Sequence, residues 1–598
     1  MSTVILPDRF ARGLLQGKRV YWLVTIEFGG AIIRLSTADL NVPGGDVIHR
    51  YWGLLQDLQY GERIDVLEDV NEGASVAIQT IVPYSIAEME AQGKRFEGSR
   101  AELARWVEGT RFEDRRVVLI GEVTDPEYAA DAEPVSFSIE QVVWKEDVIV
   151  PTSRQRVDGA TWPDGIASIA VEERGLYYPI IFGFPGRTSA VDRGWITGSQ
   201  GRWIDRRSNT GPGGTETDLE LVIAGHEVTA ERVYMNTDAN VAGERFRVFH
   251  KKDGRGQTVA YIDEFYDPDT LPVPLSTNTE SDGITTVGLG AASIDPSFQP
   301  QPSSIDPAVA PIFVGWLDDI AGGGGMKARD GGTVRELGEV LEVMLGYTNK
   351  PIDRERFRAI APLLSRYKID CVIDAQVRPW SWIRSNLLPI APIGILSGPK
   401  GLYPVLWRFD ATREDAVAHI NASANPTVQR ASSVVIDSSK IRNQFELDYA
   451  ISIRTGAYFS ALRLGPGPYD DSDPDTLPSL YCRLSQQRYR YPNGKPKIVE
   501  EKLESIVIYD RATALATLQW RARAYALAHR YVDYVVLESD FGNLERGSVV
   551  LLTDDELFIE EWICIVVDMQ SDDSGTVGLR LLRIEDPPRD GLRSVQPG

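Results

Sequence analysis

Residues 443–454 read Asn443-Gln-Phe-Glu-Leu-Asp-Tyr-Ala-Ile-Ser-Ile-Arg454, and apolar side chains alternate with polar ones along this stretch. The apolar positions are Phe445, Leu447, Tyr449, Ile451 and Ile453. Successive side chains of an extended chain point to opposite faces of a sheet. The pattern therefore predicts a long strand with one face in a core and the other in water.

An Ala-rich helix is predicted further along the chain, from Asp510 to about Tyr531. Asp510 is a good N-cap residue, and seven alanines with a stripe of larger apolar residues follow it. Small side chains allow such a helix to lie close against a sheet. Three β-rich stretches separated by glycines come next, and the middle one reads Leu544-Glu-Arg-Gly-Ser-Val-Val-Leu-Leu-Thr-Asp554. The end of the chain is thus expected to be β-structure with one long helix.

Helical periodicity marks the middle of the chain. Thr333 and Glu336 have the spacing of a capping box, and apolar residues recur at three- and four-residue steps up to Gly346. A second helix is predicted over 353–367, with a kink or break at Pro362. Further expectations are strands at 371–373 and 404–408, a short helix near 413–421 and a strand at 434–436. Together these elements predict an α+β domain.

The N-terminal region begins with a hairpin signal, because two apolar stretches at 20–27 and 31–36 flank the pair Gly29-Gly30. Strands are also predicted at 75–82, 117–123 and 135–143. Ser99 and Glu102 have capping-box spacing and Gly109 follows, so a helix is expected between them. Several strands with one flanking helix predict a β-barrel.

A second β-region is predicted between that barrel and the helical region. Short strands are expected at 219–223, 245–250 and 258–262. Residues 267–311 are rich in Pro, Ser, Thr and Asp and poor in large apolar residues, which predicts an extended loop or linker. We find no repeat of 20–50 residues, so a repeat architecture is not expected.

Length and composition bound the class of protein. The chain has 598 residues, enough for three to five domains, and 43% of them are hydrophobic. Its formal net charge of −23 repels phosphate, so nucleic acid is not expected as a main ligand. The N-terminal residues lack the pattern of a signal peptide and no long apolar run occurs, which predicts a soluble, unprocessed chain.

Cysteines and histidines offer little chemistry. The three cysteines, Cys371, Cys482 and Cys564, lie far apart beside apolar residues, which predicts buried thiols rather than a metal or iron–sulfur site. Five histidines occur at positions 49, 226, 250, 419 and 529, and none has a second histidine at helical spacing. Structural or surface roles are therefore expected for them. No catalytic, cofactor-binding or metal-binding residue is predicted, and no cofactor.

Three other segments have both a functional and a structural interpretation. Residues 322–327 are glycine-rich but lack the Gly-Lys-Ser/Thr ending of a phosphate-binding loop, which favours a flexible loop. The acidic loop Asp470–Asp475 has alternating carboxylates that could bind Ca²⁺, yet it lacks the glycine such loops use, which favours a solvated loop. The aromatic patch Tyr177–Phe184 could bind sugar or protein if exposed, or belong to a core. No Gly-x-Ser-x-Gly motif of a hydrolase occurs.

Three motifs resemble the hub proteins found at the distal end of bacteriophage tails. The first is the helix pair that ends in Tyr367-Lys-Ile-Asp-Cys-Val-Ile-Asp374, and the second is Ile441-Arg-Asn-Gln-Phe-Glu-Leu-Asp-Tyr449. The third is Asp510-Arg-Ala-Thr-Ala-Leu, which leads through its helix to Gly547-Ser-Val-Val-Leu-Leu-Thr-Asp554. Together they cover roughly residues 315–598. The hairpin at 22–36 and the segment Tyr178-Pro-Ile-Ile-Phe-Gly183 resemble hubs of long non-contractile tails.

This resemblance implies a mainly β, multidomain fold with α+β parts. The expected divisions are a tail-tube-like β-barrel at 1–155, an inserted β-domain with linker at 156–310, an α+β hub domain at 311–440 and a C-terminal hub β-domain with a long helix at 441–598. Hubs of this family form homotrimers in which two barrels per chain imitate sixfold symmetry.

The function implied is structural. A hub joins the tail tube and distal tail proteins to central and side fibres, and DNA passes through its channel without specific binding. The expected location is the virion, after synthesis in the bacterial cytoplasm. The acidic composition fits a channel wall to which DNA does not adhere. The alternatives are a receptor- or carbohydrate-binding tail module and, less favoured, a cell-wall hydrolase.

Overall fold

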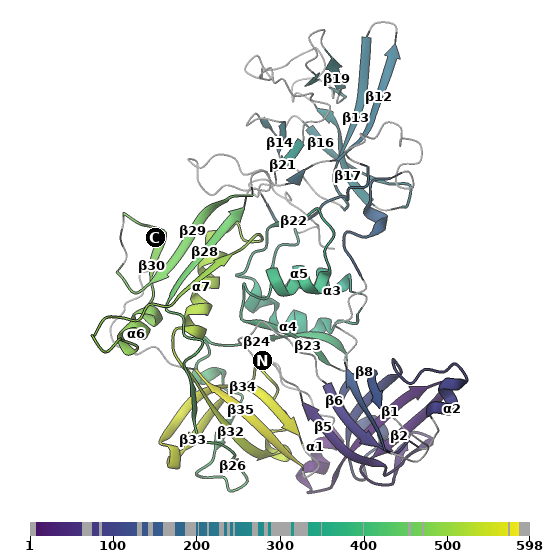
Figure 1. Ribbon diagram of the computed structural model, residues 1–598, viewed down its shortest axis with the longest axis vertical. Helices are drawn as coiled ribbons and strands as arrows, with labels where there is room; N and C mark the ends of the chain where they lie inside the picture. The colour runs from purple at the N-terminus through teal and green to yellow at the C-terminus, as the bar shows by residue number, and fades with distance from the viewer. Residues whose placement is uncertain are drawn as a thin grey trace.

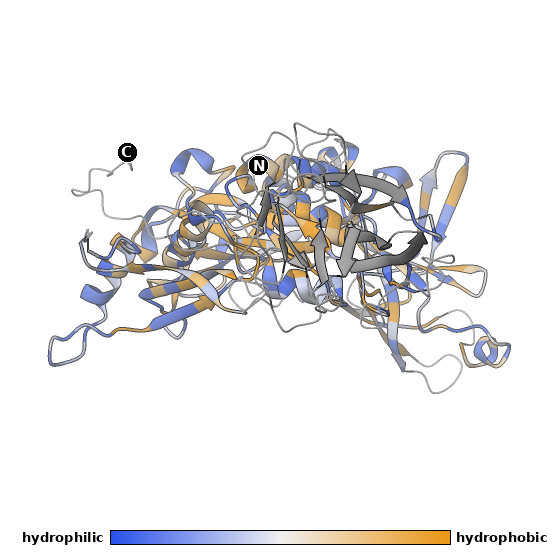
Figure 2. Ribbon diagram, turned by 90° about the horizontal axis from the view of Figure 1, so that it is seen from above, coloured by the Kyte–Doolittle hydropathy of each residue, from blue (hydrophilic) through white to orange (hydrophobic). Residues whose placement is uncertain are grey.

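The computed structural model describes residues 8–61, 75–82, 86–127, 134–140, 148–158, 174–185 and 333–584, apart from 349, 399, 452–455, 469, 471 and 572–574, and separate segments between 199 and 315. The fold is mainly β with α+β parts, as expected. Its parts are arranged around a central α+β region, with the inserted β-region at one end of the long axis and two large sheets at the other (Figure 1). Hydrophobic segments gather in the interior, and protruding loops are more hydrophilic (Figure 2).

The N-terminal sheet has seven strands in the order β2-β1-β7-β8-β9-β6-β5. Their bounds are β1 Val20–Phe28, β2 Ala31–Ser36, β5 Leu55–Gly61, β6 Ser75–Thr80, β7 Arg100–Val107, β8 Arg116–Glu127 and β9 Val135–Glu140. The segment Trp52–Leu54 bonds to β2 on one side, through Ser36 N–H to Trp52 O, and to Ile81 N–H beyond β6 on the other. The sheet is therefore nearly closed, as predicted for a barrel.

Two helices and a hairpin flank this sheet. They are α1 Asp8–Leu15, α2 Ile86–Ala91 and the hairpin of β3 Leu40–Gly44 with β4 Val47–Tyr51. The predicted β1–β2 hairpin is confirmed, and Gly29 and Gly30 both take positive φ in its turn.

The predicted helix over 99–109 is wrong, because these residues form β7 in the middle of the sheet. Ala101 and Leu103 pack into the barrel core, while Ala104 and Trp106 pack under the β3–β4 hairpin. Both faces of β7 are covered, so the polar half of a strand alternation is missing. No alternation therefore indicates a strand in this segment, and the capping-box spacing of Ser99 and Glu102 predicts a helix instead.

The inserted β-region contains two sheets. One has the order β11-β21-β14-β15, and the other has β16-β17-β13-β19-β20, with β12 and β18 added to β13 and β17. Their bounds are β11 Ser199–Gln200, β12 Arg202–Gly211, β13 Gly214–Ala224, β14 Arg232–Met235, β15 Asn240–Ala242, β16 Phe246–Lys252, β17 Thr258–Phe265, β18 Val273–Pro274, β19 Ser276–Thr279, β20 Thr285–Gly288 and β21 Ile312–Gly315.

All three strands predicted in the inserted region are present, within β13, β16 and β17. The prediction of a loop over 267–311 is wrong where short strands form, because backbone pairing with β13 and β17 places β18 and β19 in a sheet. The glycine-rich residues 322–327 lie outside the described part of the chain.

The central region holds α3 Leu337–Gly346, α4 Arg354–Leu364 and α5 Pro379–Asn386, together with β22 Cys371–Ile373, β23 Ile393–Gly398 and β24 Gly401–Leu406. Strand β22 pairs with β10 Ile180–Phe182, which precedes the inserted region. The predicted apolar stripes of both helices are buried in one core. Two details differ: Glu336, rather than Thr333, is the N-cap of α3, and α4 continues through Pro362 to end two residues later.

A four-stranded sheet packs beside the central region. It has the order β30-β29-β28-β31, with β28 Gln444–Ile451, β29 Tyr458–Gly465, β30 Thr476–Pro478 and β31 Glu500–Glu504. Helix α6 Leu480–Arg488 lies at its edge, and α7 Arg511–Tyr525 contacts β28 and β29. The predicted strand is confirmed in β28, where Phe445, Leu447 and Tyr449 are buried.

The C-terminal sheet has the order β25-β33-β34-β35-β32-β26, and β27 also pairs with β32. Its strands are β25 Ala418–Asn421, β26 Gln429–Arg430, β27 Val435–Asp437, β32 His529–Leu537, β33 Val549–Asp554, β34 Ile559–Ser571 and β35 Thr576–Arg583, and the short helix α8 Glu538–Phe541 follows β32. One apolar cluster receives side chains from five of these strands, so the sheet curls around its own core.

Two predicted helix limits are wrong in this part of the chain. Residues 413–421 form a 3-10 turn and β25 instead of a helix, because β25 pairs in parallel with β33. Helix α7 ends at Tyr525 rather than Tyr531, because His529 begins β32, which pairs with β35. Strands β25–β27 precede residue 440 and pair with strands that follow it, so this sheet crosses the expected domain division.

Candidate functional site

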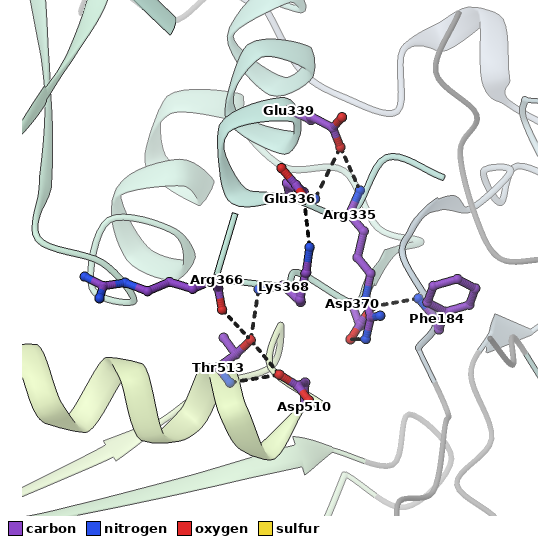
Figure 3. Close-up of polar contacts among 9 residues, drawn as sticks. All are labelled: Phe184, Arg335, Glu336, Glu339, Arg366, Lys368, Asp370, Asp510 and Thr513. Atoms are coloured by element: carbon purple, nitrogen blue, oxygen red, sulfur yellow. Dashed lines mark hydrogen bonds and ion pairs between the residues drawn. The ribbon is translucent and has the colours of Figure 1, made fainter. Parts of the chain in front are cut away.

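The charged side chains that the fold buries most deeply lie where its parts meet. Asp370 is fully buried between the central helices and the segment that enters the inserted region. Arg335 donates two hydrogen bonds to its carboxylate, from Nε to Oδ1 at 2.7 Å and from Nη2 to Oδ2 at 2.9 Å. The backbone N–H of Phe184 donates to Oδ1 at 2.8 Å (Figure 3). Burial raises the pKa of Asp370, and Arg335 and the Phe184 amide oppose that shift.

Gly183 allows the entering segment to approach Asp370 this closely. It has a φ of +61°, and a Cβ at this position would lie 2.1 Å from Asp370 Oδ1 and 2.4 Å from Ile369 O. Any other residue would clash as well as adopt a strained backbone. The guanidinium of Arg335 also lies 4.8 Å from the centre of the Phe184 ring. The stem of the inserted region is thus fixed to the central region by charge, backbone and ring contacts.

The same junction extends to α7. Thr513 Oγ1 accepts a hydrogen bond from Lys368 N–H at 2.9 Å, and Thr513 N–H donates to the N-cap carboxylate of Asp510 at 2.8 Å (Figure 3). Lys368 Nζ also pairs with Glu336 at 2.8 Å. The segment 366–370 therefore connects α3, α7 and the inserted stem.

A second buried junction joins the N-terminal and C-terminal sheets. Arg105 of β7 and Glu538 of α8 are 1% and 0% exposed, and their Nη1 and Oε2 atoms lie 2.6 Å apart. Arg116 of β8 lies 3.4 Å from the other carboxylate oxygen and donates to Gly542 O at 3.2 Å. The Arg105 guanidinium also lies 5.1 Å from the centre of the Trp22 ring. Helix α1 contacts α8 as well, so the two sheets lie side by side in fixed contact (Figure 1).

A third charged contact connects α4 with the loop before β33. Arg356 donates to both carboxylate oxygens of Glu545, at 3.2 and 2.7 Å, and its guanidinium lies 4.1 Å from the centre of the Tyr403 ring. Bidentate pairing fixes orientation as well as distance. Arginines thus tie the inserted stem and the C-terminal sheet to the central region, and another ties the N-terminal sheet to the C-terminal one.

Sequence patterns did not predict these junctions. Arg105 interrupts the apolar stretch 103–107, and Asp370 interrupts 369–373, so an isolated charge within an apolar strand was the available signal. The partner of such a charge could not be inferred from the sequence, because residues that meet at these junctions are far apart along the chain. Arg116 and Glu538, for example, are 422 positions apart.

The segments singled out from the sequence have structural contacts. In the aromatic patch, Tyr178 and Phe182 are fully buried, which supports the core interpretation over an exposed binding surface. In the acidic loop, Asp470 accepts hydrogen bonds from Ser472, and Asp475 lies 2.5 Å from Arg511. Asp471 lies outside the described residues.

The three cysteines are free and buried, as predicted. Burial raises the pKa of Cys482 to about 11 and of Cys564 to about 12, and it raises the pKa of Cys371 strongly. Among the histidines, His226 Nε2 accepts a hydrogen bond from Ile181 N–H at 2.9 Å, and His49 stacks on Phe112. These contacts are structural.

A pocket of about 30 Å³ between Arg366, Asp410 and Trp520 holds about one water molecule, which is too small for a substrate. Within the described residues no group of three or more His, Cys, Asp or Glu is arranged to hold a metal ion. In the same part of the chain, no helix has the length and hydrophobicity to cross a membrane.

No known protein family and no curated protein matches the sequence. The solved structures that match include two tail proteins and a chain of a gene transfer agent virion. The 43 kDa tail protein of prophage MuSo2 from Shewanella oneidensis is 9% identical, with 94% of this chain and 97% of that chain covered and a TM-score of 0.33. A tail protein from Neisseria meningitidis MC58 is 8% identical, with 94% and 96% covered and a TM-score of 0.34. A chain of a native gene transfer agent virion is 11% identical, with 70% and 88% covered and a TM-score of 0.32. At these scores the likeness carries no functional conclusion.

Proposed function

We propose that this chain is a structural virion protein, the trimeric hub of a bacteriophage tail tip or baseplate. The observation that carries the proposal is the pair of curled sheets held side by side within one chain by the buried contact of Arg105 with Glu538. Three such chains would present six similar sheets in a ring, which matches the sixfold symmetry of a tail tube. The hub motifs in the sequence imply the same arrangement.

The other parts of the chain fit the supporting role of a hub. The inserted β-region extends from the central region at the opposite end of the long axis from the two large sheets (Figure 1). In a ring, such extensions are available to tip or fibre proteins, while the sheets face the tail tube. The net charge of −23 lets DNA pass through the central channel without adhering to it. No reaction is assigned to the protein.

The binding-module alternative depended on an exposed aromatic patch at 177–184. The burial of Tyr178 and Phe182 removes two of the four rings that would contact a sugar, so we retain the hub as the function.

Light scattering followed by negative-stain images tests this function. A trimer of about 200 kDa, three times the 66.3 kDa of one chain, is expected to appear in top view as a ring with a central hole. The measurement is made with the chain alone and with tail-tube protein added. A chain that remains monomeric in both samples, or that forms particles without threefold symmetry, would contradict the hub. A basic channel wall would contradict the proposed role of the acidic charge.

A further inference from the structure

An aromatic side chain is presented to solvent in the turn between β33 and β34. Phe558 has a relative exposure of 94% and a φ of +55°. A bulky L-residue disfavours this left-handed conformation, and water disfavours an exposed phenyl ring. The buried carboxylate of Asp554 holds the turn by accepting hydrogen bonds from Glu556 N–H at 3.0 Å and Leu557 N–H at 3.3 Å. Tyr534 OH donates to the same carboxylate at 2.6 Å. The fold therefore maintains the exposed position of Phe558 against its intrinsic preferences.

Acidic residues flank Phe558 on both sides in the sequence. The carboxylates are Asp555, Glu556, Glu560 and Glu561, and we call residues 554–561 the acidic knob. Arg430 pairs with Glu556 at 2.6 Å, and Arg413 pairs with Glu561. Together with the buried Asp554, the flanking residues make five carboxylates against two arginines, which leaves the knob negative. A complementary surface must offer both apolar area for the ring and positive charge for the rim.

The N-terminal half of the chain has a surface of that kind on the β3–β4 hairpin. Ile48, Arg50 and Trp52 occupy alternate positions and share one face, with Pro43 paired opposite Ile48. Ile48 is 69% and Trp52 38% exposed, and the Arg50 guanidinium lies 4.2 Å from the centre of the Trp52 ring. The other face of the hairpin carries the buried Tyr51, which packs on the sheet. We call Pro43, Ile48, Arg50 and Trp52 the outer stripe.

The acidic knob lies far from the outer stripe of its own chain. Asp554 pairs with Ile559 at the first residue of β34, while the last residue, Ser571, pairs next to the end of β32 that leads into α8. The thirteen residues of β34 thus separate Phe558 from Glu538 by a strand length, roughly 40 Å. The outer stripe lies at the α8 side, because His49 stacks on Phe112 of a 3-10 turn that contacts α1, and α1 contacts α8.

We propose that the acidic knob of one copy of this chain binds the outer stripe of the next copy, head to tail, and that three such contacts close the ring. The inference rests on the proposed trimeric hub and names the surfaces that would form it. Phe558 would insert beside Ile48 and Trp52, and the acidic rim would face Arg50. A heterologous contact of this kind uses two different surfaces, so a ring forms when its rotation closes. Both surfaces are exposed in the single chain, which is what an unoccupied interface requires.

Sedimentation of chains altered in only one of the two surfaces tests each surface separately. Phe558→Ser should weaken self-association at least tenfold, and the double variant Ile48→Ser/Trp52→Ser should weaken it equally. Tyr491→Ser is a matched control, because this ring is 49% exposed on a different turn and should leave assembly unchanged. Circular dichroism of each variant confirms that it folds.

Mixing the variants tests whether the two surfaces bind each other. The Phe558→Ser chain keeps its outer stripe and the stripe variant keeps its knob, so an equimolar mixture is expected to form a one-to-one heterodimer while each variant alone stays monomeric. If the wild-type chain is trimeric and either variant remains so, the interface assignment is overturned but the hub is not. If both variants are monomeric and their mixture is too, the pairing of these surfaces is overturned. A wild-type chain that is monomeric alone and with tail-tube protein overturns both the interface and the hub.

Discussion

Replacing Glu538 by Gln should destabilise the contact between the two large sheets by about 3–4 kcal/mol. The carboxylate is 0% exposed, lies 2.6 Å from the 1% exposed Arg105 and 3.4 Å from Arg116. The amide keeps the size of the side chain but leaves two guanidinium groups without the charge that compensated their burial. Removing one partner of a buried ion pair typically costs about 3–5 kcal/mol, and the retained hydrogen-bonding capacity of the amide favours the lower half of that range.

Urea unfolding followed by tryptophan fluorescence measures this loss, and Trp22, which lies 5.1 Å from the Arg105 guanidinium, is one of the 13 tryptophans that contribute to the signal. A chain of several domains need not unfold in one step, so the free energy is taken from the transition that this fluorescence follows. Glu355→Gln is the matched control: Glu355 pairs with Lys400 at 2.8 Å, but both are exposed, and no change is expected.

A double variant tests whether the loss comes from leaving a buried charge without its partner. Arg105→Met/Glu538→Leu replaces both groups by apolar ones of similar size, and it should recover most of the stability lost in Glu538→Gln. A loss below about 1 kcal/mol for Glu538→Gln would refute the buried ion pair as the basis of the junction.

Three further predictions concern the central region and the cores. Gly183→Ala should lower the free energy of chemical unfolding by at least about 3 kcal/mol, because its Cβ would lie 2.1 Å from a carboxylate oxygen. Gly30→Ala, where φ is also positive but the space is open, should lower it by about 1–2 kcal/mol. Equal losses would contradict the close approach at Gly183. Asp510→Ala removes the N-cap of α7 and should lower the free energy of unfolding by about 1 kcal/mol, measured by circular dichroism in urea, and an unchanged midpoint would exclude this cap. The pKa values of Cys482 and Cys564 are raised to about 11 and about 12. The neutral thiol's contribution to stability is therefore present below about pH 8.5 and is lost progressively as pH rises from there through those values. A disulfide reagent at pH 9 should therefore modify no cysteine of the folded chain and three in denaturant, and fast labelling of the folded chain would show that the thiols are accessible.

Sequence reasoning succeeded where one local pattern had a single interpretation. The alternation through Phe445 and Leu447 predicted β28, and the stripe through Leu337 and Leu341 predicted α3, because in each case one face meets a core and the other does not. It failed where tertiary contacts cover both faces. In β7, Ala104 and Trp106 are buried on the side where a strand in water would carry polar residues, so the alternation that identifies a strand is absent.

The helix limits failed for a related reason. Residues 526–531 continue the Ala-rich composition of α7, and nothing local shows that His529 begins a strand. Pairing selects the extended conformation there, with β27, where Asp437 lies opposite His529, and with β35, about fifty positions later. The contact of Arg105 with Glu538 joins residues that are still further apart in the sequence. The local sequence therefore shows an isolated charge in an apolar stretch but does not identify its partner.

Buried ion pairs, rather than apolar contacts, connect the parts at both junctions, and this difference affects the geometry of the molecule more than its stability. Apolar side chains at Arg105 and Glu538 would supply comparable stability, since the desolvation of two charges offsets much of their attraction. An ion pair differs from an apolar contact in how steeply the free energy rises when the partners separate. The rise is steep because a displaced arginine or carboxylate remains buried without its partner, which is costly. We infer that these pairs fix the angle between the sheets, which the proposed ring of six sheets needs more than it needs added stability. In particle images, the Arg105→Met/Glu538→Leu chain is expected to show a spread of angles between the two sheets, and a single angle identical to that of the wild type would contradict this inference.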